Sequence, residues 1–192
     1  MANLIQSKTT VADVLAPSAV SITSNEIQIG DKFLRTIFIT AFPRFLPANW
    51  FSAIINLDST YSASIFIHPQ DTGEILRKLR EQLVRVQAEM IENDSSGKIR
   101  DPALETAVAD IEALRDSLQQ GNDKFFRFGL YITLMGATLQ EIDDLEAKIR
   151  SMLESQLIYI KPATFRQKEG FISTMPLNQD LLDETTALNT AP

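Results

Sequence analysis

The chain has 192 residues, of which 44% are hydrophobic and 22% are charged, proportions typical of a globular domain rather than of a disordered or fibrous chain. It contains no cysteine, which excludes disulfides, thiolate metal sites and a cysteine nucleophile. The net charge of −7 disfavours contact with nucleic-acid phosphates, so we expect no direct nucleic-acid partner. No apolar run reaches the roughly 18 residues of a membrane span, so we expect a cytoplasmic chain with no transmembrane segment.

The first third of the chain predicts strands around one short helix. Residues 1–24 are rich in Ser, Thr and Ala, and we expect a loosely ordered lead. Residues 26–30 and 32–42 predict two strands of a hairpin. Apolar residues at helical spacing over 47–57 predict a helix of about three turns, since a proline suits the first helical position. The alternating pattern over 61–69, which ends at a proline, predicts a long strand.

A long helical hairpin is predicted over about 71–120. Asp71 with Glu74 has the spacing of an N-cap pair and opens the first helix. Asp101-Pro102 opens the second helix after a short polar turn. Two helices joined by so short a turn favour an antiparallel pair.

The second half predicts a central strand followed by a helix and a last strand. Residues 124–137 are apolar on both faces, which is typical of a strand inside a sheet. A capping box at Thr138 opens the next helix, and residues 157–161 predict the final strand. Residues 166–174 predict one or two helical turns, and we expect residues 176–192 to form an extended tail.

The element order predicts an α+β fold over residues 25–175. We interpret it as a ferredoxin-like sandwich of two βαβ-type units, with the long helical hairpin inserted between them. The two shorter helices are expected on one face of the sheet. The open face, or the hairpin, would then be left for a partner.

Residues able to carry catalysis are scarce. The seven glycines are scattered, so the sequence has no phosphate-binding loop. A Ser-His-Asp triad would depend on the only histidine, His68, which we interpret instead as closing a strand. We therefore predict no catalytic, cofactor-binding or metal-binding residue. The acidic side chains with the spacing to hold a hard cation are interpreted as solvated surface, namely Asp143, Asp144, Asp180, Asp183 and Glu184.

An ordered set of short segments carries a resemblance to a known family. The segments are residues 32–37, 41–44, 50–51 and 67–69, then 110–116, 125–126, 165–171 and 175–177. In order and spacing they resemble the amino-terminal domain of the conjugative-transfer or type IV secretion ATPase family, the VirB/TrbE/CagE kind. The resemblance extends from about Val11 to the end of the chain.

The resemblance implies a non-catalytic docking and assembly domain. In that family the ATPase domain follows this region, so ATP and Mg are expected only there and this chain is not expected to be an enzyme. The implied partners are inner-membrane subunits of the secretion channel, with self-association in the full-length protein, at the inner face of the cell membrane. From apolar residues on the helices we predict seven partner-docking residues: Trp50, Phe51, Leu83, Val86, Met90, Ile111 and Leu114.

Two alternatives remain open from the sequence. One is a free-standing α+β module that binds a ligand or regulates another protein, because a ferredoxin-like sandwich carries many functions. The other is an enzyme with an unrecognised carboxylate site. Turnover abolished by a single carboxylate substitution would favour the enzyme.

Overall fold

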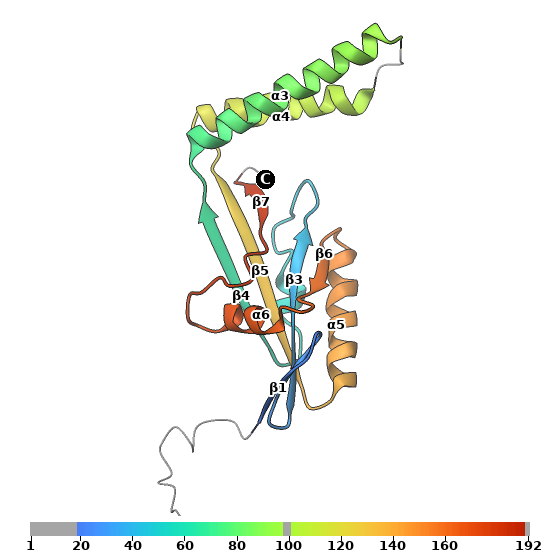
Figure 1. Cartoon of the computed structure of the whole chain (residues 1–192), viewed down its shortest axis with the longest axis vertical. Coiled ribbons are helices and arrows are strands. Elements are labelled where there is room, and N and C mark those ends of the chain that lie inside the picture. Colours follow the sequence, from blue (N-terminus) through green and yellow to red (C-terminus); the bar gives the residue numbers. More distant parts are fainter. Residues whose placement is uncertain (1–18, 98–100, 191–192) are drawn as a thin grey trace, which may run out of the picture.

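In the part of the chain that the structure describes, seven strands form an antiparallel sheet, and a pair of long helices projects from it (Figure 1). The computed structural model describes residues 19–97 and 101–190, so most of the lead predicted over 1–24 lies outside the described residues. The structure is 41% helical and 27% strand, which confirms the predicted α+β class.

The sheet begins with the predicted hairpin. β2 (Ile27–Ile29) pairs antiparallel with β3 (Lys32–Ala41), and Gly30 turns the chain between them with a positive φ of 61°. An additional short strand, β1 (Val20–Ile22), pairs with the outer edge of β2.

The longest strand, β5 (Phe125–Gly136), lies in the middle of the sheet, as predicted. On one side, its residues Phe126 to Leu134 pair with the whole of β4 (Tyr61–Pro69). Its other side is shared by β3 and by β7 (Thr186–Asn189), a strand that the sequence did not predict. The predicted last strand is present as β6 (Tyr159–Pro162) and pairs with β3.

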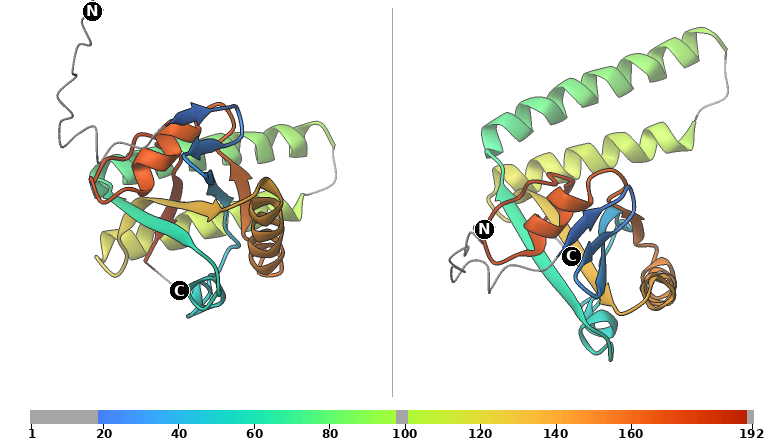
Figure 2. Two further views of the ribbon diagram at one scale, coloured as in Figure 1. Left: turned by 90° about the horizontal axis from the view of Figure 1, so that it is seen from below. Right: turned by 60° about the horizontal axis from the view of Figure 1, so that its bottom comes forward.

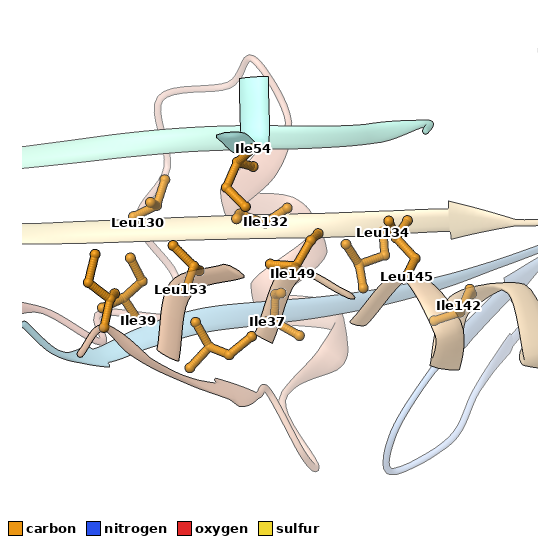
Figure 3. Close-up of a cluster of buried hydrophobic side chains, with 12 residues drawn as sticks. Ile37, Ile39, Ile54, Leu130, Ile132, Leu134, Ile142, Leu145, Ile149 and Leu153 are labelled. Atoms are coloured by element: carbon orange, nitrogen blue, oxygen red, sulfur yellow. The ribbon is translucent and has the colours of Figure 1, made fainter. Parts of the chain in front are cut away.

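The main core lies between the sheet and α5 (Leu139–Glu154), as Figure 3 shows. Thr138 caps this helix by accepting a hydrogen bond from the backbone nitrogen of Glu141. Buried side chains recur along α5 at helical spacing and pack on the branched residues of β3 and β5. The fully buried members include Ile37, Leu130, Ile132, Leu134, Ile142, Ile149 and Leu153.

The helix predicted over 47–57 is only one turn long, so the prediction of about three turns was wrong. The observed helix is α2 (Ser52–Ile55). Asn49 has a positive φ of 67°, and a right-handed helix starting at Pro47 cannot pass through such a residue. The apolar residues in this segment instead reflect a loop that packs on the main core, since Trp50 and Phe51 both contact that core.

A further helix covers the other face of the sheet, which differs from the expected single covered face. This helix, α6 (Gln167–Thr174), packs against β3 and β5 (Figure 1). It approaches the sheet closely because Gly170 has no side chain: a Cβ there would lie 2.8 Å from Thr36. Beside α6, the chain before β7 buries Leu182 against Tyr131.

The predicted helical hairpin is present as α3 (Thr72–Ser95) and α4 (Pro102–Gln119). Asp71 and Asp101 cap the two helices through their side-chain oxygens, as expected. The hairpin has a small core of its own around Ile75, Leu79 and Leu118. Figure 2 shows the two helices extending away from the sheet and side by side along their length.

Candidate partner-docking site

The structure separates the seven predicted docking residues into two groups. Trp50 and Phe51 pack against the main core, and the ring of Trp50 meets that of Phe42 edge-on at 5.7 Å. The other five lie on the hairpin, where Leu83 is buried and the rest are half-buried: Val86, Met90, Ile111 and Leu114. Ile111 and Leu114 pack against the hairpin core, so the structure places the seven residues on two separate parts of the fold.

Among the described residues of the hairpin, two large apolar side chains that the sequence analysis missed are exposed. Val84 is 61% exposed and Ile91 is 70% exposed. They stand seven residues apart on α3, so they lie on the same side of that helix. The sequence could have indicated their exposure, because both lie outside the helical row of apolar residues that contains the buried Leu79 and Leu83. An exposed apolar stripe on a projecting helix is typical of a helix that contacts another protein.

The base of the hairpin is tied to the sheet by a buried carboxylate, Asp123, which is only 4% exposed. It accepts a hydrogen bond of 2.7 Å from the hydroxyl of Ser117 at the end of α4. It also accepts hydrogen bonds from Thr190 at 3.1 Å and from Asn189 at 3.4 Å. One side chain thus joins α4, the start of β5 and the chain beyond β7.

A second tie connects the middle of α4 to the loop that follows β3. The guanidinium of Arg44 forms an ion pair with Asp110 and lies 5.5 Å from the ring centre of the exposed Phe45. Between this loop and α4 there is a groove with a volume of about 490 Å³, lined by Phe45, Leu114 and Asp123 among others. The groove offers an aromatic ring and aliphatic side chains beside carboxylates, which suits an apolar side chain with a polar end.

His68 takes part in a network that fixes the chain before β7. Its Nε2 lies 2.9 Å from a carboxylate oxygen of Asp180, whose other oxygen accepts a 2.7 Å hydrogen bond from the hydroxyl of Tyr131. Burial, reinforced by the hydrogen bond to this carboxylate, raises the pKa of Tyr131 well above its usual value. The backbone nitrogen of Glu184 donates to the same hydroxyl oxygen. The network therefore holds residues 180–184 against the sheet.

The acidic residues considered as cation ligands are occupied by partners within the chain. Asp183 pairs with Arg127 at 2.6 Å, and Glu184 pairs with Arg166 at 3.0 Å. Asp143 is 2.6 Å from Arg35, and the amide of Gln140 donates to Asp144. Across residues 19–97 and 101–190, no group of three or more His, Asp or Glu side chains is placed to hold a metal ion.

Comparison of the sequence with models of known protein families gives no match, and comparison with curated proteins gives none either. Among the described residues, no helix is both long enough and apolar enough to cross a membrane. The case for a function therefore depends on the surfaces of the domain.

Proposed function

We propose that the chain is a non-catalytic docking and assembly domain of a conjugative type IV secretion ATPase. It links the motor to inner-membrane subunits of the channel and to neighbouring copies during the transfer of DNA or protein, from the cytoplasmic side of the cell membrane. The observation that carries the proposal is the projecting hairpin, which has its own core and presents Val84 and Ile91 to solvent. ATP and Mg belong to the ATPase domain of the family.

The strand order supports a ferredoxin-like arrangement for the sheet body. β3 and β5 are adjacent, β6 lies outside β3, and β4 lies outside β5. The units β3-α2-β4 and β5-α5-β6 thus each place a partner strand between their own two strands, as split βαβ units do. The helical hairpin is inserted between the two units.

The ties at the base of the hairpin support a mechanical role. A force on α3 and α4 reaches the sheet through Asp123 and through the ion pair of Arg44 with Asp110. Asp123 also holds Asn189 and Thr190, so the same force reaches the chain that leaves β7. A docking domain that couples a motor to a membrane platform needs such a connection between its contact surface on the hairpin and the segment around β7.

Co-purification tests the proposal. The chain is co-expressed with the inner-membrane subunits of a conjugative channel, and recovery of these subunits is compared for the intact chain and for a variant in which residues 71–123 are replaced by a short turn. The intact chain should recover the subunits and the shortened chain should not. Equal recovery by both would contradict docking through the hairpin.

The groove beside Phe45 favours a second candidate, a free-standing α+β module that binds a small ligand or regulates another protein. Its volume of about 490 Å³ is within the range of ligand sites. A small molecule that raises the melting temperature of the intact chain but not of a Phe45→Ala variant would support this candidate.

A further inference from the structure

The free edge of β4 is a second exposed surface, on the sheet body rather than on the hairpin. β4 pairs with β5 in an unbroken register from Tyr61 to Pro69, and no strand within 19–97 and 101–190 pairs with its other edge. The strand contains no Asp, Glu, Lys or Arg. Its outward side chains Ile65 and Ile67 are 54% and 58% exposed. Proteins usually protect such an edge with charged residues, prolines, bulges or a short strand; β4 has no Asp, Glu, Lys or Arg and no bulge, and its one proline is its last residue, Pro69.

The loop between α6 and β7 flanks this edge. Figure 1 shows the loop passing beyond the free edge of β4, and the right-hand view of Figure 2 agrees. Between strand and loop there is a hollow of about 290 Å³, lined on the strand by Ser64, Ile65 and Phe66 and on the loop by Met175, Pro176 and Asn178. The residues that line the hollow carry no charge, although 22% of the chain is charged.

We propose that β4 binds an extended, uncharged segment of a partner protein by strand addition. The backbone of the segment pairs with the free edge, as in other complexes formed by an added strand. Successive side chains of a strand point to opposite faces, so one set would lie beside Ile65 and Ile67 and the other set would lie beside Ser64 and Phe66, next to the hollow. The uncharged lining on both sides favours neutral, apolar side chains.

The flanking loop distinguishes a single segment from a second copy of the chain. In a sheet-to-sheet pairing, the covering elements of the second copy would have to occupy the space where residues 175–178 pass the edge. A lone strand brings no such elements. The edge belongs to the sheet body, so strand binding could hold even if the hairpin docked no channel subunit.

The test uses a fluorescein-labelled peptide of alternating valine and threonine, with fluorescence anisotropy as the readout. The intact chain should bind it saturably. Ile65→Lys should weaken binding roughly tenfold or more, because the ammonium group lies beside the added strand. Leu157→Lys, a comparably exposed apolar site between α5 and β6, is the matched control and should leave binding unchanged. Peptide binding should also slow amide hydrogen exchange in residues 61–69.

The same peptide methylated on alternate backbone nitrogens separates strand pairing from apolar contact, since it keeps its side chains and loses ladder donors. It should not bind. Equal affinity for the methylated peptide, or no saturable binding by the intact chain, would overturn the proposal. If the chain dimerises without any peptide and Ile65→Lys abolishes the dimer, the edge binds a second copy of the chain. That outcome also overturns the proposal. A failed co-purification with channel subunits would not change the expected peptide affinities, so the two proposals fail separately.

Discussion

Tyr131 and Asp180 stand 49 positions apart in the sequence and are joined by a hydrogen bond of 2.7 Å on the α6 face of the sheet. Tyr131 is fully buried, and the Nε2 of His68 lies 2.9 Å from the other carboxylate oxygen of Asp180. This contact fixes the path of the chain toward β7, whose end is bound in turn by Asp123 at the base of the hairpin. The hairpin, the sheet and the segment around β7 are thereby connected through a short series of polar contacts.

Tyr131→Phe should lower the free energy of unfolding by about 1–2 kcal/mol at neutral pH, because Asp180 loses a donor and Glu184 loses an acceptor. The raised pKa of the folded tyrosine adds a pH dependence. Above the unfolded value of 10.0, the unfolded state releases the phenol proton while the folded state keeps it, so stability falls with pH. Above pH 10.0, the free energy of unfolding of wild type should therefore fall by up to about 1.4 kcal/mol per pH unit relative to that of Tyr131→Phe.

Urea unfolding of both proteins between neutral pH and pH values above 10 checks this prediction. Using the difference between the two proteins cancels the titration of lysines and of the other tyrosines. A difference that stays constant with pH would show that the Tyr131 phenol ionises normally in the folded chain.

Asp123→Ala should destabilise the domain by about 1–3 kcal/mol, since it leaves three donors at the base of the hairpin without their acceptor. Asp110→Ala is the control, because its ion pair with Arg44 is largely exposed and is expected to contribute at most about 1 kcal/mol. Denaturant unfolding measures both, and hydrogen exchange should show faster opening of Thr186–Asn189 in Asp123→Ala. Equal effects of the two variants would contradict an anchoring role for Asp123.

Replacing residues 71–123 by a short glycine-containing turn should leave the sheet body folded. Gln70 donates its backbone hydrogen to Phe125 at 3.0 Å, so the ends of β4 and β5 are already close enough for a tight turn. The main core and the hairpin core share no buried residue. Near-UV circular dichroism and cooperative urea unfolding check the result, with an expected loss of about 1–3 kcal/mol from the missing Asp123 contacts. A variant without cooperative unfolding would show that the sheet needs the hairpin.

Gly170→Ala should destabilise the domain by about 1–3 kcal/mol, because the added Cβ would lie 2.8 Å from two carbon atoms of Thr36. Lys168→Ala on the exposed side of α6 is the control and should change stability by no more than about 0.5 kcal/mol. Thermal unfolding compares the two. If Gly170→Ala is as stable as wild type, α6 does not pack on the sheet as closely as described.

Local patterns account for the elements that the sequence predicted well. Alternation that ends at a proline located β4 from Tyr61 to Pro69, and Asp71 does cap α3 by accepting from Glu74. β7 escaped prediction because four residues carry little periodicity and depend on pairing with β5. The Asp123 anchor escaped for a related reason: its contact with Thr190 joins residues 67 positions apart, which no local pattern records. The helical period of α3 does separate the exposed Val84 from the buried Leu83 beside it, but an apolar residue outside the buried row was not recognised as a surface feature.

Docking through the hairpin is tested most directly by the double substitution Val84→Glu and Ile91→Glu. Both side chains point to solvent, so folding should be retained. The matched control is Val20→Glu with Ile22→Glu, a valine and an isoleucine that are comparably exposed on β1. Recovery of inner-membrane channel subunits by the Val84/Ile91 variant should fall roughly tenfold or more, and the β1 variant should recover them like wild type. Undiminished recovery by the Val84/Ile91 variant would contradict the account.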